Sequence, residues 1–205
     1  MPTSDVYNID CMEYMRRLPD NAFQLAIVDP PYGLPRKATT GSGKLRGRLL
    51  NRSDIARRWD QKPAPEYFEQ LWRVSVNQII WGGNYFDLPP CRCFVVWDKV
   101  QSLPTFSQAE YAWTSFDRPA KLFRMSNKCR KIHPTQKPVE LYAFLLNNFA
   151  KPGDRILDTH LGSGNSRIAA YKLGYDFVGT EIDKEYYDAG IKRFTHECLS
   201  QLTLF

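Results

Sequence analysis

The feature that most constrains the fold of this chain is a near-continuous apolar segment, Phe23–Val28, which ends abruptly in Asp29-Pro30-Pro31-Tyr32. A short apolar segment of this kind is typical of a strand that is covered on both faces, as the strands of a parallel sheet are. Ligands of open α/β sheets bind at the carboxyl ends of such strands. We therefore expect a buried parallel sheet with this polar tetrapeptide at its carboxyl edge.

The rest of the chain alternates strand and helix patterns, which favours an α/β fold with a largely parallel sheet. Its 205 residues suffice for one domain with a sizeable core, so we expect a single domain over residues 1–205. The expected strands are 6–9, 78–81, 94–97, 155–157 and 177–179, with weaker candidates at 111–116 and 122–125. The expected helices are 12–18, 65–76, 168–173 and two that start near 138 and 184. We expect the two weaker strands to form a hairpin through Asp117-Arg118-Pro119.

Composition and cysteine usage exclude several classes of protein. No segment approaches the run of about 18 apolar residues that spans a bilayer, and the N-terminus lacks a signal pattern. The five cysteines are odd in number and include no CxxC, so we expect a reducing cytoplasm and no disulfide framework. Cys91, Cys93, Cys129 and His133 do not have a familiar zinc spacing, and buried cysteines are the better interpretation. We therefore expect no metal.

The net charge of +6 arises from one segment, residues 34–60, which also contains several glycines. Between Arg36 and Arg58 it holds eight basic residues against the single acid Asp54: Arg36, Lys37, Lys44, Arg46, Arg48, Arg52, Arg57 and Arg58. A basic loop of this kind suits the phosphate backbone of a nucleic acid, whose attraction is indifferent to sequence. The alternative is a solvated loop without a partner. Charge alone does not distinguish DNA from RNA.

Residues 156–166 read as a strand, a glycine-bearing turn and the start of a helix. Glu181 follows Gly162 by nineteen residues, at the end of the next expected strand. In nucleotide-binding βαβ units an acidic residue about 20 positions on binds the ribose hydroxyls. The third glycine of the dinucleotide fingerprint is missing, which favours a smaller adenosyl ligand, although two glycines in a βα turn are common.

The tetrapeptide after Phe23–Val28 suits one chemical task, which is to make the amino group of a nucleobase nucleophilic. The Asp29 carboxylate and the Pro30 carbonyl could each accept one N–H, so that the nitrogen lone pair points at an electrophile. The two prolines stiffen the loop. The Tyr32 ring offers a platform for a base that has left its helix. The alternative is that these residues form only a turn.

Four segments resemble the motifs of one family. Asp29-Pro30-Pro31-Tyr32 matches its DPPY motif, and His133-Pro134-Thr135-Gln136-Lys137-Pro138 matches its HPTQKP element. The segment from Asp158 to Gly164 resembles its cofactor loop, and Asn8-Ile9-Asp10-Cys11 resembles its N-terminal G-D-C element. The sequence thus resembles DNA amino-methyltransferases of the permuted (beta) class. Within that class it resembles the small phage- and prophage-type adenine-N6 methylases. It departs from the family in Thr159-His160-Leu161, where Pro-Phe-x is usual, and in its small target-recognition region.

The resemblance implies a Rossmann-like class I methyltransferase fold: a mostly parallel sheet with one antiparallel strand and helices on both faces. It implies methyl transfer from S-adenosylmethionine to N6 of a flipped adenine in double-stranded DNA, with catalysis by Asp29, Pro30, Pro31 and Tyr32. Cytosine N4, an RNA substrate and a catalytically silent binding protein remain alternatives. The implied cofactor residues are Asp10, Cys11, Thr135, Lys137, Asp158, His160, Gly162, Ser163, Gly164, Asn165, Glu181 and Ile182.

Two expectations concern partners. The last five residues resemble a short peptide that docks bacterial replication proteins into the sliding clamp, through Gln201, Leu202, Leu204 and Phe205. Apolar anchors on a free terminus are one way to fill a partner's groove, and the alternative is that the tail packs on its own domain. The small recognition region makes a homodimer plausible. The recognition sequence and the biological setting (restriction, phage or regulatory) stay open.

Overall fold

The computed structural model describes residues 1–33, 61–102, 107–126 and 136–200. The basic segment 34–60, Cys129, His133, Thr135 and the last five residues lie outside them. The predictions made for these residues are therefore not addressed by the structure.

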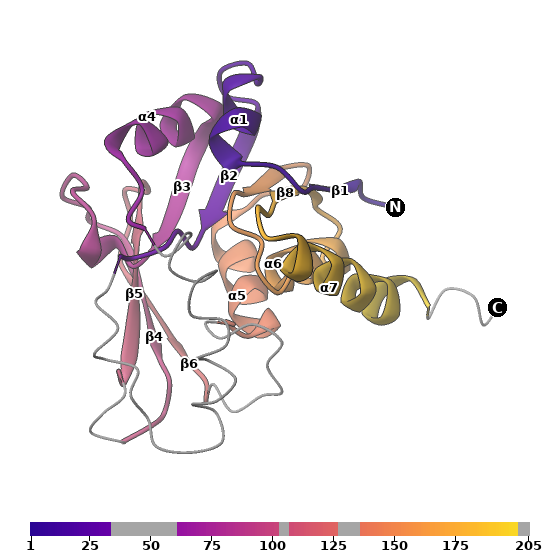
Figure 1. Ribbon diagram of the computed structural model, residues 1–205. Helices are drawn as coiled ribbons and strands as arrows, with labels where there is room; N and C mark the ends of the chain where they lie inside the picture. Colours follow the sequence, from indigo (N-terminus) through magenta and orange to yellow (C-terminus); the bar gives the residue numbers. More distant parts are fainter. Residues whose placement is uncertain (34–60, 103–106, 127–135, 201–205) are drawn as a thin grey trace.

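Eight strands form one sheet in the order β1-β8-β7-β2-β3-β5-β4-β6 (Figure 1). The strands are β1 Ser4–Tyr7, β2 Phe23–Val28, β3 Ser75–Trp81, β4 Phe94–Asp98, β5 Ala109–Thr114, β6 Lys121–Arg124, β7 Arg155–Asp158 and β8 Asp176–Thr180. Strand β5 runs antiparallel to both of its neighbours, β3 and β4, and all the other pairs are parallel. The predicted mostly parallel sheet with one antiparallel strand is confirmed.

The predicted hairpin between the last two strands of the first half is wrong. Strand β6 pairs with β4 in parallel, so that Leu122 lies beside Val96, and it does not pair with β5. The connection from β5 to β6 packs on helix α5 (Val139–Phe149) instead of turning tightly. The ring of Phe116 lies 5.0 Å from that of Phe149, and the guanidinium of Arg118 lies 4.0 Å from the Phe149 ring. These contacts pack the connection against the core, and the chain crosses from β5 to the far side of β4, where β6 pairs.

Helices cover both faces of the sheet, as predicted (Figure 1). Alternate side chains of β2 show this: Leu25 and Ile27 join the cluster beneath α5 and α6 (Asn165–Lys172), whereas Ala26 and Val28 join the cluster beneath α1 (Cys11–Arg16) and α4 (Pro65–Val74). All four side chains are at most 1% exposed. This two-sided burial explains why the segment is apolar at successive positions rather than at alternate ones.

The remaining helices complete the second half. Helix α7 spans Lys184–Phe194 and continues into a π-helical turn, Thr195–Leu199, while a short 3-10 helix η2, Gly83–Tyr85, follows β3. Phe194 and Cys198 pack on Ile168 of α6. Within the described residues, no helix is both long enough and apolar enough to cross a membrane.

The sheet topology collects polar residues at one edge. Strands β1, β8, β7, β2 and β3 are parallel, so their carboxyl ends lie together. Glu181, Asp29 and Gly82 each follow such an end directly, and Asp158 is the last residue of β7. Because β5 is antiparallel, the same edge receives its first residues, including Glu110.

Candidate active site

The tetrapeptide after β2 forms a connected polar group with a residue more than 100 positions away. The Tyr32 hydroxyl donates a hydrogen bond of 2.7 Å to Asp29 Oδ1. Lys137 Nζ donates to Asp29 Oδ2 and lies 3.4 Å from the Tyr32 hydroxyl. The side chain of Lys137 is only 2% exposed and that of Asp29 is 16% exposed. The fold thus brings together residues that the sequence assigned separately to catalysis and to cofactor binding.

The Tyr32 ring is packed tightly by the segment that follows β3. The Tyr85 ring stacks on it with centroids 4.9 Å apart, and Phe86 meets it edge-on at 6.1 Å. Gly82 has φ +68°, and a Cβ at this position would lie 2.6 Å from both Cδ1 and Cζ of Tyr32. Only glycine fits there, for its backbone conformation and for space. Burial raises the pKa of Tyr32 far above its usual range, so the hydroxyl keeps its proton.

Lys137 has a second carboxylate partner, which the sequence analysis did not single out. Its Nζ lies 3.2 Å from Oε2 of Glu110 on β5, and the other oxygen of Glu110 lies 2.6 Å from Lys99 Nζ. Burial works to lower the pKa of Lys137, but Asp29 and Glu110 outweigh it, and the pKa lies above its usual range. Burial works to raise the pKa of Glu110, but Lys137 and Lys99 outweigh it, and the pKa is lowered. Lys137 and Glu110 therefore both carry charge near neutral pH.

The loop after β7 is organised by Asp158. Its Oδ1 accepts the backbone N–H of His160 at 3.0 Å, and its Oδ2 accepts the Ser166 hydroxyl at 2.5 Å. Burial raises the pKa of Asp158 to about 7. At the start of α6 the Asn165 amide donates to the backbone carbonyl of Lys137, which ties the loop to the residue beside Asp29.

Glu181 closes the glycine turn from the end of β8. Its Oε2 accepts the backbone N–H of Gly162 at 2.7 Å, and its Oε1 accepts that of Asp183 at 2.9 Å. Gly162 and Gly164 both have left-handed backbone conformations, with φ of +53° and +74°. Burial raises the pKa of Glu181. Ile182, the next residue, is 60% exposed.

The remaining predicted cofactor residues lie at the starts of helices and in the altered loop. Asp10 caps α1 by accepting the N–H of Met12 at 2.9 Å, and burial, with the charge of Asp10, raises the pKa of Cys11 to about 12. Thr159 Oγ1 lies 2.6 Å from the Tyr67 hydroxyl and 2.9 Å from His160 Nδ1. Burial lowers the pKa of His160 to about 4, so its ring is neutral.

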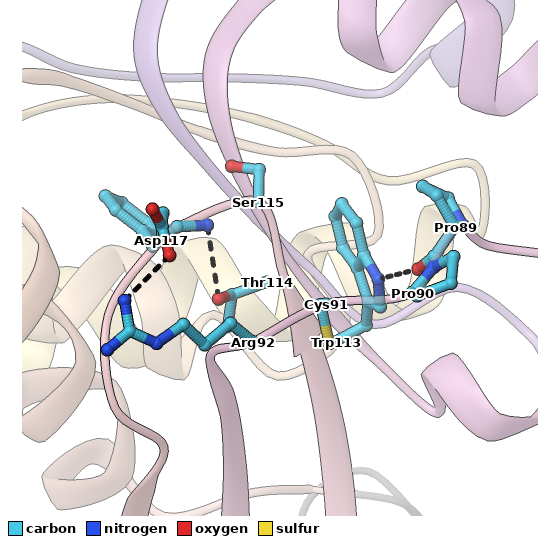
Figure 2. Close-up of a pocket in the computed structure, with 9 residues that line it drawn as sticks. Pro89, Pro90, Cys91, Arg92, Trp113, Thr114, Ser115 and Asp117 are labelled. Carbon is cyan, nitrogen blue, oxygen red and sulfur yellow. Dashed lines mark hydrogen bonds and ion pairs between the residues drawn. The ribbon is translucent and has the colours of Figure 1, made fainter.

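A separate cavity lies around the opposite end of β5. Its volume is about 360 Å³, and Figure 2 shows its lining residues Pro89, Pro90, Cys91, Arg92, Trp113, Thr114, Ser115 and Asp117, with Phe116 completing the wall. The Trp113 indole N–H donates to the Pro89 carbonyl at 2.7 Å, and Arg92 pairs with Asp117 at 3.0 Å. Among the predicted catalytic and cofactor residues that the structure describes, none lines this cavity.

The cysteines considered as zinc ligands have other partners where they are described. Cys91 Sγ lies 3.4 Å from the Tyr111 hydroxyl, and Cys93 Sγ lies 3.6 Å from the Pro119 carbonyl. Across the described ranges no group of three or more His, Cys, Asp or Glu side chains is arranged to hold a metal ion. Cys129 and His133 lie outside those ranges.

Comparison with known proteins gives consistent matches. A family model described as DNA methylase, of the N6/N4 methyltransferase type, matches residues 46–192. The Type II methyltransferase M2.DpnII of Streptococcus pneumoniae is 30% identical over 135 residues, which cover 66% of this chain but only 48% of that protein. The putative methylase YubD of Escherichia coli (strain K12) is 26% identical over 208 residues, covering 90% of this chain and 87% of YubD.

A solved structure shares the fold at low sequence identity. It is that of TTHA0409, a putative DNA modification methylase from Thermus thermophilus, in complex with S-adenosyl-L-methionine. The TM-score is 0.58 at 17% identity, with 96% of this chain and 95% of the other covered. The likeness extends over nearly the whole length of both chains.

Proposed function

We propose that this chain, which belongs to the N6/N4 DNA methylase family, transfers a methyl group from S-adenosylmethionine to the exocyclic N6 of adenine in DNA. The observation that carries the proposal is the group formed by Asp29, Tyr32 and Lys137 at the carboxyl edge of the sheet. It presents a carboxylate beside an aromatic ring, which are the two features needed to bind and orient an amino-bearing base.

The residues at the neighbouring strand ends fit S-adenosylmethionine. Asp10, Asp158 and Glu181 follow or end β1, β7 and β8, and none of them forms an ion pair with another described residue. Asp158 is buried, Glu181 is half-buried and Asp10 is exposed, and carboxylates without a cation at such an edge suit a ligand that brings cationic groups and ribose hydroxyls of its own. Under the proposal Glu181 binds the ribose, Asp10, Cys11 and Ile182 contact the adenine, and the loop from Asp158 to Asn165 borders the methionine end together with His160, Thr135 and Lys137.

When bound, S-adenosylmethionine supplies a methyl group whose bond to sulfur breaks as its bond to nitrogen forms, leaving the thioether S-adenosylhomocysteine. Asp29 accepts one N–H of the target amino group and the Pro30 carbonyl accepts the other, which turns the nitrogen lone pair toward the methyl carbon. Tyr32 stacks on the base. The methylated nitrogen is a cation, and its proton leaves through Asp29 or to water, so no strong base is required.

Adenine is proposed over cytosine because the first residue of the motif is Asp29, and Asp at this position usually accompanies N6 methylation in this family. The second candidate is N4 of cytosine, because the matching family covers both reactions. The eight basic residues of segment 34–60 are proposed DNA contacts. Docking of the C-terminal peptide into a sliding clamp and homodimerisation remain predictions.

The experiment measures transfer of labelled methyl from S-adenosylmethionine to unmethylated genomic DNA, followed by nucleoside analysis. We expect N6-methyldeoxyadenosine from the wild type and none above background from Asp29→Ala. Asp117→Ala is the matched control, because that carboxylate is 86% exposed and forms only a surface ion pair. N4-methyldeoxycytidine would replace adenine by the second candidate. Absence of product on DNA, with the cofactor bound, would contradict the proposal.

A further inference from the structure

Glu110 is a largely buried carboxylate whose placement depends on the one antiparallel strand. It is the second residue of β5, and β5 begins at the edge where β3 ends. Its side chain is 23% exposed and lies between two ammonium groups, Lys99 and Lys137, which are 15% and 2% exposed. The Glu110 carboxylate therefore forms ion pairs with two lysines, of which Lys137 is the more deeply buried.

Lys137 in turn lies between two carboxylates. Asp29 and Glu110 approach its Nζ from β2 and β5, and the Tyr32 hydroxyl is a third polar neighbour at 3.4 Å. Within the described residues, Oε2 of Glu110 has no hydrogen-bond partner, and it contacts Lys137 as an ion pair at 3.2 Å. The Lys137 ammonium also lies 5.2 Å from the centroid of the Trp81 ring, which limits its freedom to move away.

The sharing has a chemical consequence for Asp29. A buried carboxylate that is the sole counterion of a buried ammonium forms a close pair, and its oxygens are then poorer acceptors for a further N–H. When a second carboxylate lies at ion-pair distance from the same ammonium, it balances part of the positive charge, and the first carboxylate stays a stronger acceptor. Asp29 is the group that must accept an N–H from the target base under the proposed function.

We propose that Glu110 is a positioning residue of the methyl transfer: it holds the Lys137 ammonium between two carboxylates, so that Asp29 stays an effective acceptor for the amino group of the target base. This inference rests on the proposed function, because it concerns the same site. Glu110 acts through Lys137 and does not itself touch the base.

A purely structural role for Glu110 makes different predictions. If the carboxylate only fastened β5 to the sheet, its loss would lower stability, and would lower activity at every pH and for every kinetic constant. If it acts through Lys137, its loss changes kcat and leaves the Michaelis constants in place. The groups that face Lys137 are Asp29, Glu110, Tyr32 and Tyr142, and only Asp29 and Glu110 are acids that hold its proton near neutral pH.

The test compares Glu110→Gln, Glu110→Asp and the exposed helix control Glu69→Gln. For Glu110→Gln we expect kcat to fall about tenfold, a typical coupling for members of one ion-pair network. We expect KM for S-adenosylmethionine and for DNA to stay within about twofold, because the variant leaves the binding contacts in place. Glu110→Asp keeps the negative charge beside Lys137 and should restore the wild-type kcat.

An unchanged kcat in Glu110→Gln would overturn the inference, as would a loss of kcat in Glu110→Asp as large as that in Glu110→Gln. If Glu110→Gln does not fold, Glu110→Asp decides alone: a wild-type kcat supports the inference, because the charge beside Lys137 is what it requires, and a kcat lowered about tenfold contradicts it. Should the wild type methylate no DNA, the proposed function fails by itself. The Glu110–Lys137 contact is then judged from the pH of alkaline unfolding, which Glu110→Gln should lower and Glu69→Gln should not.

Discussion

Replacing Gly82 by alanine should damage the protein in two separable ways. The first is conformational: a non-glycine residue at φ +68° costs about 1–2 kcal/mol. The second is steric, because the new Cβ would lie 2.6 Å from two ring atoms of Tyr32, and the ring is held by Tyr85 and Phe86. Overpacking of this kind costs about 1–3 kcal/mol. The ring can yield only by moving its hydroxyl away from Asp29.

Comparison with Gly174→Ala separates the steric cost from the conformational cost. Gly174 has φ +82°, and a Cβ there would meet no atom within 4 Å. It should therefore show the conformational cost alone. The difference between the two variants, about 1–3 kcal/mol, corresponds to about 2–12 °C in melting temperature for a chain of this size.

The assay is thermal unfolding of both variants, followed by methyl transfer. We expect Gly174→Ala to keep the wild-type transfer rate and Gly82→Ala to lose most of it, since the Tyr32–Asp29 hydrogen bond would be broken. The reasoning would be refuted if both variants unfold at the same temperature, or if Gly82→Ala transfers methyl groups at the wild-type rate.

Two further predictions concern the carboxylates of Asp158 and Glu181. Burial raises the pKa of Asp158 to about 7, so the folded state binds its proton more tightly than the unfolded state does. The stability of the wild type should then fall as pH rises from about 4 to 7, by a few kcal/mol at most. Asp158→Asn should flatten that slope in urea titrations at several pH values, and an unchanged slope would contradict the assignment. Glu181→Gln should weaken S-adenosylmethionine binding about tenfold by calorimetry, because a hydrogen bond to a charged group is replaced by a neutral one. Equal affinity would remove Glu181 from the proposed ribose site.

The sequence predicted the second half of the fold well, for a physical reason. Strands β7 and β8 and helices α5 and α6 carry apolar residues at clear spacings, and the polar residues at their ends stand where the pattern stops. The strand Phe23–Val28 was predicted to the residue, because its run of buried apolar residues is followed directly by the polar tetrapeptide. Local pattern is enough where an element is buried by its immediate neighbours.

The order of strands β5, β4 and β6, at the edge of the sheet that ends in β6, could not be predicted in this way. Adjacent strands joined by a short Pro-containing link favoured a hairpin, yet Phe116 and Arg118 pack on Phe149, more than thirty residues further along the chain. The same limit hid part of the site. Glu110, Tyr85 and Gly82 belong to no motif, and each has its role only because β5 and the segment after β3 meet the tetrapeptide in space.

The position of β2 in the sheet has a consequence for how the two ligands of the proposed reaction would be held. Strand β2 separates β7, which ends in Asp158, from β3, which leads to Gly82 and the Tyr32 ring. Asp29 is thus one strand away from each side, and neighbouring strands are about 4.8 Å apart. The backbone hydrogen bonds between β7, β2 and β3 therefore fix the spacing between the methyl donor and the methyl acceptor. Substitutions of side chains that contact either ligand should change how tightly that ligand binds, but they should not change this spacing.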